Sequence, residues 1–305
     1  MFDVIIIGSG PAGLTAGIYT SRAALKTLIV AGNTWGGQLM LTTEVENYPG
    51  FPEGILGPEL MQKMRKQAER FGVEFIDQNV TAVDFSKQPF TTKTEGKEYQ
   101  GKSIIVATGA DTLWLNAPGE KQFIGKGVSS CAPCDAFFYK DKEVIVVGGG
   151  DSAMEEALVL TKFASKVTVV HRRNEFRASK IMQDRVKNHP NIEILWNTTV
   201  EEVKGSNKVE SVVLKTDEKS YEKRIDGIFV AIGHVPNSSI VENILDRDGK
   251  GFIKRIPTNG YKTSSNISGV FVAGDVHDHF YKQAVTAAAY GCEAALEVER
   301  WLEEQ

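Results

Sequence analysis

A glycine-rich turn between a short apolar strand and a helix occurs twice in this chain of 305 residues, and this repetition constrains the fold more than any other feature. In the first copy, Val4–Ile7 leads into Gly8-Ser9-Gly10-Pro11-Ala12-Gly13, and a helix is predicted over Leu14–Ala24. Such glycines permit a tight turn, let the backbone approach a pyrophosphate and allow close packing of helix on strand. A plain glycine turn is the alternative, but the flanking strand and helix favour a dinucleotide site.

The second copy begins at another predicted buried strand, Val144–Val147. It continues through Gly148-Gly149-Gly150-Asp151-Ser152-Ala153 into a predicted helix, Met154–Phe163, with Ala153 at the third small position. Each copy is followed, further along the chain, by a buried strand that ends in glycine, at Ser103–Gly109 and at Gly227–Gly233. The chain is therefore predicted to be internally duplicated.

The residues that follow the second strand of each copy differ, and this difference predicts a different nucleotide for each copy. Val167–Val170 ends at His171-Arg172-Arg173, with Arg177 close behind. An NAD site carries an acid roughly 20 residues past the turn, whereas arginine there suits a 2′-phosphate, so NADPH is favoured over a solvated basic face. In the first copy Thr27–Val30 ends at Ala31-Gly32-Asn33 without an acid, which disfavours an ordinary NAD site.

The last part of the chain, after residue 237, is too short for a domain of its own. It holds a predicted strand, Gly269–Ala273, then Gly274-Asp275 and an alanine-rich helix over Gln283–Leu302, which we expect to complete the first nucleotide domain. The predicted fold class is α/β, with two Rossmann-like, three-layer dinucleotide-binding domains, the second inserted into the first. The predicted ranges are 1–113 with 245–305 for the first domain and 114–244 for the second.

The remaining elements are predicted from periodicity and turn residues. The polar, turn-rich region after Trp35 is expected to be a long loop, and loops of this size are usually functional or disordered. An amphipathic helix is predicted over Gly57–Gly72. The other predicted strands are Val73–Ile76, Val80–Phe85 and a β-meander within 190–226 that contains Ile192–Trp196, Thr199–Val203 and Val209–Leu214.

Two of the three cysteines form a Cys131-x-x-Cys134 pair, and Asp135 follows at once. At this spacing one thiol can be nucleophilic near neutral pH and the other can resolve a mixed disulfide, while the carboxyl can carry a proton to a thiolate. Half of a zinc site is the alternative, but zinc needs two further ligands and no matching spacing exists. Cys292 is expected to fill apolar space, and His277-x-His279 to lie in a loop beside a cofactor, so no metal is expected.

Two nucleotide sites and one dithiol require a two-electron relay, and a flavin accepts hydride and can reduce a disulfide. The first turn is the candidate FAD site. Because the dithiol directly precedes the second turn, nicotinamide and dithiol would compete for one flavin. We expect a rotation of residues 114–244, with hinges near Thr112–Trp114 and Asn237–Asn243.

Composition excludes several classes of partner. The formal net charge of −4 gives no reason to expect nucleic acid or a membrane surface. No apolar stretch approaches the ~20 residues of a membrane helix, and no basic segment of a signal peptide precedes Val4. Three cysteines do not make a secreted disulfide framework. A cytoplasmic protein is therefore expected.

These motifs, together with those around residues 36–47, 176–178 and 283–284, carry a family resemblance over essentially the whole chain. The chain closely resembles the low-molecular-weight thioredoxin reductases of bacteria and archaea, within the two-dinucleotide-fold flavoproteins. The resemblance implies a cytoplasmic homodimer that transfers electrons from NADPH through FAD and the dithiol to thioredoxin or a thioredoxin-like redoxin. Pro133 stands where family members often have threonine, which could shift the redox poise or the preferred partner.

The resemblance also implies residue roles. Cys134 would be the thiol nearest the flavin, Cys131 would attack the disulfide of thioredoxin, and Asp135 would be the general acid. The residues expected to hold FAD are Gly8, Ser9, Gly10, Pro11, Ala12, Gly13, Thr34, Gly36, Gly37, Gln38, Leu39, Asn47, Thr108, Gly109, Gly274, Asp275, Lys282, Gln283 and Ala284. Those expected to hold NADPH are Gly150, Asp151, Ser152, Ala153, His171, Arg172, Arg173 and Arg177.

Other activities are compatible with parts of this pattern. One is reduction of another small redoxin or of a peroxidase partner. A flavin-dependent thiol oxidase that uses oxygen is another, but the arginine cluster argues that NADPH is used. A redox-inert nucleotide sensor is a third, and the intact Cys131/Cys134 pair argues against it.

Overall fold

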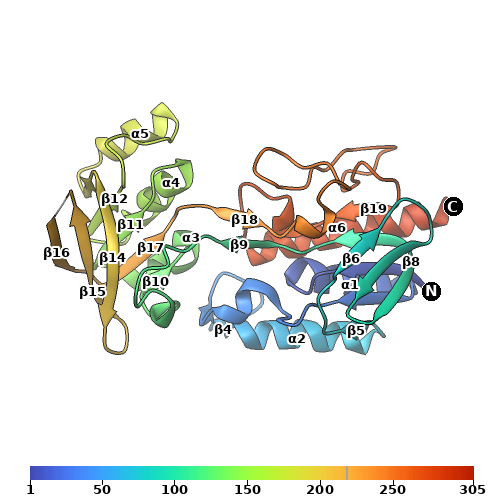
Figure 1. The fold of residues 1–305 in the computed structure, drawn as a ribbon. Helices are drawn as coiled ribbons and strands as arrows, with labels where there is room; N and C mark the ends of the chain where they lie inside the picture. The colour runs from blue at the N-terminus through green and yellow to red at the C-terminus, as the bar shows by residue number, and fades with distance from the viewer. Residues whose placement is uncertain (218) are drawn as a thin grey trace. The chain divides into compact units, whose positions relative to one another are not determined.

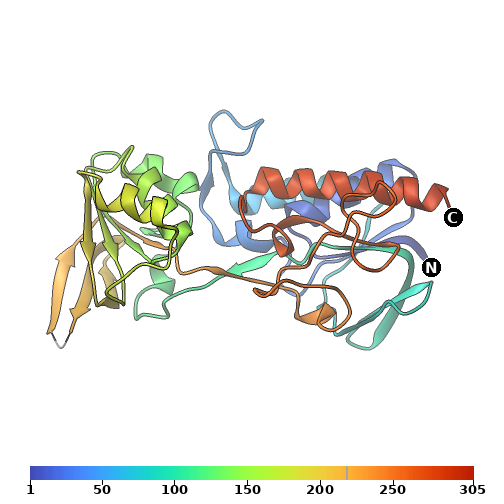
Figure 2. The same cartoon turned by 90° about the horizontal axis from the view of Figure 1, so that it is seen from above.

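The computed structural model describes residues 1–217 and 219–305, and the chain divides into two compact units (Figures 1 and 2). Unit 1 comprises Met1–Asp111 with Val235–Gln305, and unit 2 comprises Thr112–His234. Each is built on a sheet with a parallel core, and the second is inserted into the first, so the predicted fold class is confirmed. Within the described residues, no helix combines the length and the apolar character needed to cross a bilayer.

The chain leaves unit 1 through β9 (Ala110–Thr112) and returns through β18 (His234–Pro236), and these two strands pair with one another. The return comes earlier than the predicted boundary at 244/245. The predicted hinge Asn237–Asn243 belongs to unit 1, because the Asn237 N–H donates to the Gly109 carbonyl at 2.9 Å and Val241 is fully buried in the core of that unit. The short strand β18 is therefore a better hinge candidate than the segment after it.

Unit 1 is organised around β1 (Phe2–Ile7), the first strand of the chain. The strand order is β5-β2-β1-β8-β7-β6, and β19 also pairs with β8. The strands that run parallel to β1 are β2 (Thr27–Val30), β5 (Glu74–Ile76), β8 (Lys97–Val106) and β19 (Val270–Val272). Since β19 comes from the end of the chain, the tail completes the first sheet.

Helices α1 (Pro11–Arg22), α2 (Gly57–Arg70) and α6 (Ala284–Glu303) belong to unit 1 (Figures 1 and 2). They share one core cluster with Val4 and Ile6 of β1. Ile5 and Ile7 alternate to the other face and join a second cluster. A strand buried on both faces reads as a continuous apolar run, which explains why β1 was predictable.

The sheet of unit 1 also contains a hairpin that the sequence prediction missed. It joins β7 (Phe90–Thr94) to the first half of β8, and β6 (Ala82–Asp84) pairs with β7. The predicted strand began at Ser103, whereas β8 begins at Lys97. Exposed charged residues alternate with buried ones in the first half of β8, so its apolar signal is weak.

Unit 2 contains a parallel sheet in the order β10-β17-β11-β12-β13. Its strands are β10 (Val128–Ser129), β11 (Glu143–Val147), β12 (Lys166–Val170), β13 (Ile192–Leu195) and β17 (Gly227–Val230). The helices α4 (Asp151–Leu160) and α5 (Lys180–Lys187) cover one face. An antiparallel sheet in the order β14-β15-β16 contributes the core on the other face, with strands β14 (Thr198–Gly205), β15 (Val209–Thr216) and β16 (Lys219–Arg224).

The sequence prediction differs from the structure at four elements of unit 2. The sequence predicts β13 as part of the meander, but Ile192 pairs in parallel with Val167 of β12. Periodicity alone does not identify a pairing partner. The strand β16 and the short helix α5 were missed because both are rich in exposed polar residues. The helix α4 begins at Asp151, directly after the glycine turn, and not at Met154.

Candidate active site

The dithiol lies where β10 leads into a one-turn helix, α3 (Ala132–Asp135). Cys131 is the N-cap of α3, and its Sγ is bonded to the Sγ of Cys134, with the Cα atoms 5.3 Å apart. The Cys131 carbonyl accepts the N–H groups of Cys134 at 3.2 Å and Asp135 at 3.1 Å, so the turn holds the two cysteines together. Pro133 is exposed and occupies the first turn of α3, where its fixed φ is compatible with a helix. The sequence-predicted redox pair is therefore a closed disulfide at the surface of unit 2.

Asp135 is half-buried beside this pair. Burial raises the pKa of its carboxyl, and a hydrogen bond with Ser129 opposes that shift. The Ser129 hydroxyl also accepts the N–H of Cys131 at 3.1 Å. A carboxyl with a raised pKa next to a disulfide is suited to donate a proton to a departing thiolate.

Glu156, on α4, is a second carboxyl at the dithiol that the sequence analysis missed. Its Oε2 accepts the N–H of Ala132, the residue after Cys131, at 2.5 Å. Burial raises the pKa of Glu156 to about 8, and the carboxylates of Asp135 and Glu155 add to the shift, while the Ala132 N–H opposes it. In sequence Glu156 is an ordinary helix residue, so only the contact between α3 and α4 identifies it.

The raised pKa of Glu156 predicts a pH-dependent stability. Its folded pKa of about 8 exceeds the reference value of 4.5, so the folded protein holds a proton that the unfolded chain releases. Stability is therefore fully present below about pH 4.5 and is lost as the pH rises toward 8. After allowance for the partial exposure of Glu156, we expect the free energy of unfolding to fall by ~1–3 kcal/mol less in Glu156→Gln than in the wild type over this pH range. Thermal unfolding between pH 6 and 9 would show a flatter decline of Tm for the variant.

Glu143→Gln is the matched control for this measurement. Glu143 is an exposed carboxylate of the same unit, so its variant should decline in parallel with the wild type. Equal slopes for wild type and Glu156→Gln would show that Glu156 does not hold its proton at neutral pH.

The first glycine turn, between β1 and α1, has the close packing of a dinucleotide turn. Gly8 has a φ of +114°, and a Cβ there would lie 2.2 Å from the carbonyl oxygen of Ala107. A Cβ on Gly13 would lie 2.0 Å from the Gly8 carbonyl oxygen. A Cβ on Gly10 would meet nothing within 4 Å, so the backbone there is open to a ligand. Pro11 begins α1, and Ala12 is buried behind the turn.

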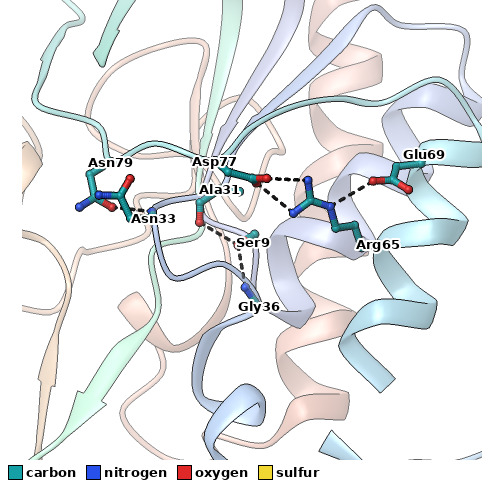
Figure 3. Close-up of polar contacts among 8 residues, drawn as sticks. All are labelled: Ser9, Ala31, Asn33, Gly36, Arg65, Glu69, Asp77 and Asn79. Atoms are coloured by element: carbon teal, nitrogen blue, oxygen red, sulfur yellow. Dashed lines mark hydrogen bonds and ion pairs between the residues drawn. The ribbon is translucent and has the colours of Figure 1, made fainter. Parts of the chain in front are cut away.

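The buried hydroxyl of Ser9 ties this turn to the end of β2 and to the loop that follows (Figure 3). Ser9 Oγ donates to the Ala31 carbonyl at 2.8 Å and accepts the Gly36 N–H at 2.9 Å. At the position where an acid is absent, the Asn33 N–H donates to Asn79 Oδ1 at 3.0 Å. The loop is thus held by its backbone while its exposed side chains, including Thr34, are available to a ligand.

Arg65 of α2 holds the residues that flank this loop (Figure 3). Its guanidinium makes two bonds to Asp77, at 2.9 and 3.0 Å, and one to Glu69 at 3.1 Å. It also stacks on Trp35, 4.7 Å from the ring centroid, and on Phe75 at 4.5 Å. This packing fixes the start of the 35–41 loop from behind.

The loop predicted after Trp35 contains regular structure. Gly36 and Gly37 both have positive φ, +93° and +69°, and lead into the 3₁₀ helix η1 (Gly37–Leu41). Gln38 donates to Asp111 at 2.8 Å. Asn47 Nδ2 donates to Gln283 Oε1 at 3.3 Å, so the structure brings together two predicted ligand residues that lie 236 positions apart.

Two further predicted ligand residues of unit 1 carry buried polar atoms without a partner among the described residues. They are Thr108 Oγ1, after β8, and Asp275 Oδ1, after β19. Burial raises the pKa of Asp275 to about 6. Gly109 and Gly274 have φ of +73° and +78°, which open both turns. Unpaired buried oxygens are costly, so these atoms are suited to a polar ligand at the carboxyl ends of parallel strands.

The C-terminal loop presents the last predicted residues of unit 1. Asp278 accepts the backbone N–H groups of Phe280, Tyr281 and Lys282, and Lys282 then adopts a φ of +47°. Gln283 caps α6 in a reciprocal capping box with Thr286, and Ala284 opens the helix.

The two histidines of this loop do not converge on one point. His277 packs against Tyr290, with centroids 4.6 Å apart, whereas His279 packs on Phe252 at 4.3 Å and lies 3.3 Å from Asp248.

The second glycine turn, between β11 and α4, is also closely packed. A Cβ on Gly148 would lie 2.4 Å from the Ala231 carbonyl oxygen, whereas one on Gly150 would meet nothing within 4 Å. Asp151, the first residue of α4, accepts the backbone N–H and the hydroxyl of Ser179 at 2.9 and 2.7 Å. Ser152 is exposed on the first turn of α4, and Ala153 is fully buried.

The His171 ring packs against the backbone of this turn. Its ring occupies the space where a Gly149 side chain would be, with Cε1 2.2 Å from the ideal Cβ position, and Nε2 lies 2.9 Å from the Glu175 carbonyl. Burial lowers the pKa of His171, so the ring is neutral at pH 7. The Gly149 carbonyl also accepts the Arg177 N–H at 2.7 Å, so the same glycine lies against the His171 ring and bonds to the arginine loop.

Arg172, Arg173 and Arg177 are exposed on this loop. Within the described part of the chain, none of the three takes part in an ion pair with a carboxylate. Three guanidinium groups that form no ion pair with any described carboxylate, beside an open glycine turn, are suited to a phosphate.

Comparisons with known proteins agree with this architecture. Residues 2–291 match the family model "Pyridine nucleotide-disulphide oxidoreductase". The chain is 52% identical to the thioredoxin reductase of Rickettsia prowazekii (strain Madrid E), over 98% of this chain and 97% of that protein, and 50% identical to that of Mycolicibacterium smegmatis, over 99% and 97%. The solved structure of thioredoxin reductase from Giardia duodenalis superimposes with a TM-score of 0.93 at 44% identity and 99% coverage of both chains. That from Streptococcus pyogenes MGAS5005 superimposes with a TM-score of 0.94 at 39% identity, over 100% of this chain and 99% of that one. With two dinucleotide turns, a redox disulfide and this similarity along its whole length, the chain belongs to the pyridine nucleotide-disulphide oxidoreductases and, within them, to the low-molecular-weight thioredoxin reductases.

Proposed function

We propose that the protein reduces the disulfide of thioredoxin, or of a thioredoxin-like redoxin, with electrons from NADPH that pass through FAD and the Cys131–Cys134 disulfide. The observation that carries the proposal is the closed, partly exposed disulfide with Asp135 beside it, in a chain with two open dinucleotide turns. A flavin and a pyridine nucleotide are the cofactors of this family. We propose that in this protein the flavin is FAD and the pyridine nucleotide is NADPH.

The residues of unit 1 fit an FAD molecule. The open backbone at Gly10 and the positive end of α1 would receive the pyrophosphate. The unpartnered oxygens of Thr108 and Asp275 would accept or donate hydrogen bonds to the polar chain of the cofactor. Asn47 and Gln283, already in contact, would hold it from the two ends of the unit 1 sequence. When bound, the flavin would supply two-electron exchange between a nicotinamide and a disulfide.

The residues of unit 2 fit NADPH. Gly150 leaves room for the pyrophosphate at the N-terminus of α4, and the exposed guanidinium groups of Arg172, Arg173 and Arg177 suit a 2′-phosphate. His171 would hold the arginine loop in place through Glu175.

The chain's own chemistry concerns the disulfide. Its reduction breaks the S–S bond, adds two electrons and requires two protons when both sulfurs end as thiols. Asp135 would protonate the thiolate of Cys134. Cys131 would then attack the disulfide of the redoxin, and Cys134 would resolve the mixed disulfide, so that the redoxin leaves as a dithiol and the Cys131–Cys134 bond reforms.

We also propose that unit 2 rotates between hydride entry and dithiol exchange, with β9 and β18 as the hinge strands. The reason is the one given by the sequence: the dithiol and the NADPH residues belong to the same unit and need the same flavin. A covalent crosslink between the units that left turnover intact would contradict the rotation. A homodimer and a cytoplasmic location are further proposals, which rest on the family resemblance, and sedimentation of the purified protein tests the first.

Gly10→Ala is expected to weaken flavin binding without unfolding the protein. The φ of Gly10 is −69°, and its Cβ would meet no protein atom, but it would project where the backbone must approach the pyrophosphate. We expect roughly a 10- to 100-fold rise in the flavin Kd and little change in the thermal stability of the apoprotein. Flavin fluorescence titration and thermal unfolding of apoprotein measure the two effects.

Gly8→Ala is the matched comparison. Its Cβ collides with Ala107, and its φ is unfavourable for alanine, so this variant should lose stability even without flavin. If Gly10→Ala bound flavin normally, the pyrophosphate would not lie against this turn.

A further inference from the structure

Glu156 links the two functional turns of unit 2. It lies on α4, whose N-terminus is the dinucleotide turn, and its carboxyl accepts the N–H of Ala132 in the dithiol turn at 2.5 Å. Glu156 is the sixth residue of α4, which places it ~8 Å along the helix axis from the first. A single helix therefore carries the nucleotide site at one end and supports the disulfide further along.

The charges that act on Glu156 are negative. Asp135 acts from α3 and Glu155 from its own helix, and the Ala132 N–H is the opposing group. Tyr139, in the following 3₁₀ helix, faces Asp135 in turn, and burial raises the pKa of its phenol. Helix α5 also packs against α4. The negative charge of Asp135 disfavours ionisation of the buried Glu156, so the pair retains a proton near neutral pH.

A retained proton has a use at a disulfide. Reduction leaves thiolates at Cys131 and Cys134, and a thiolate beside two carboxylates would be strongly disfavoured. If Asp135 gives up its proton to a thiolate, a neighbouring carboxylic acid can share its own proton with the resulting carboxylate.

We propose that Glu156 is a positioning residue of the redox disulfide, which fixes the Cys131–Cys134 turn through the Ala132 N–H and holds the proton that restores Asp135. The proposal rests on the proposed function, since it concerns the same disulfide. It goes beyond it by assigning the proton supply to a pair of carboxyls and not to Asp135 alone.

The test follows reduction of the disulfide by dithiothreitol, without pyridine nucleotide or thioredoxin. The extent of reduction is read by labelling free thiols. The protein used carries Cys292→Ser, so that every labelled thiol belongs to Cys131 or Cys134. The rate constant is divided by the thiolate fraction of dithiothreitol and followed from pH 6 to 9.5. The background protein should show a decline with a midpoint near pH 8, where Glu156 loses its proton. The variant Glu156→Gln, whose amide oxygen can still accept the Ala132 N–H, should react about tenfold more slowly at pH 7 and lack the inflection.

The conservative variant and a control complete the design. Glu156→Asp should keep an inflection, because it still carries a proton, and Glu143→Gln should match the background. A Glu156→Gln protein with an unchanged rate and inflection overturns the proposal, as does one that is slow but keeps the inflection, because either result leaves Glu156 with at most a structural role.

If Glu156→Gln fails to fold, two measurements decide. One is Glu156→Asp in the same assay, and the other is the infrared absorption of protonated carboxyls in the wild type. A wild type with no such carboxyl titrating between pH 7 and 9 contradicts the proposal. Since neither measurement uses thioredoxin, an error in the proposed partner would leave the result readable.

Discussion

Replacement of Cys134 by serine is expected to lower the rate of thioredoxin reduction by at least ~10³-fold while NADPH still reduces the flavin. Serine is nearly isosteric with cysteine, and the turn is held by backbone bonds to the Cys131 carbonyl, so the fold of α3 should persist. The loss is large because the disulfide has no substitute: among the described residues the one other cysteine, Cys292, lies on α6 of unit 1. Steady-state reduction of thioredoxin measures the effect.

A stoichiometric titration separates this loss from a damaged cofactor site. The wild type should take up about two equivalents of NADPH under anaerobic conditions, one for the flavin and one for the disulfide, and Cys134→Ser about one. Cys292→Ser is the control and should behave as the wild type. A Cys134→Ser protein that reduced thioredoxin at the wild-type rate would show that the electrons do not pass through this pair.

Removal of two arginines, Arg172→Ala with Arg173→Ala, is expected to reduce kcat/KM for NADPH by roughly 10²-fold. Each charge-assisted hydrogen bond to a phosphate contributes ~1.5–3 kcal/mol, and every ~1.4 kcal/mol is a factor of ten. Both side chains are exposed, so the lower end of that range applies. The kcat/KM for NADH, which lacks the 2′-phosphate, should change little.

The comparison of the two nucleotides is the decisive part of that experiment. Arg224→Ala removes an exposed arginine from β16 of the same unit and controls for a general loss of positive charge. A double variant that lost NADPH and NADH activity equally would place the arginines outside the 2′-phosphate site.

Much of the fold could be predicted because its central strands carry strong local signals. The strand β1 is apolar at nearly every position since both of its faces are covered, and the glycine turns follow it and β11 directly. The return of the tail to the first sheet also follows from the sequence, because the segment around Val270–Val272 is too short to fold alone. The Cys131–Cys134 pair could be predicted from the spacing of the two cysteines alone.

The failures have a common cause, which is that the deciding contacts are tertiary. The strand β16 is almost entirely exposed, so it has no apolar alternation, and β13 reads the same whether it pairs with β12 or β14. In the site, the sequence places His171 beside the arginines but does not show that its ring is buried against Gly149. Glu156 has no motif at all and becomes visible only through its bond to Ala132.

The most direct test of the central claim is the visible spectrum of the purified protein under anaerobic conditions, first with NADPH and then with oxidised thioredoxin. We expect a flavin spectrum that bleaches on addition of NADPH and recovers when thioredoxin is added. Bleaching without recovery would keep the reductase but assign it to another redoxin. The absence of bleaching by NADPH would contradict the account, because the arginine loop and the second glycine turn would then have another ligand.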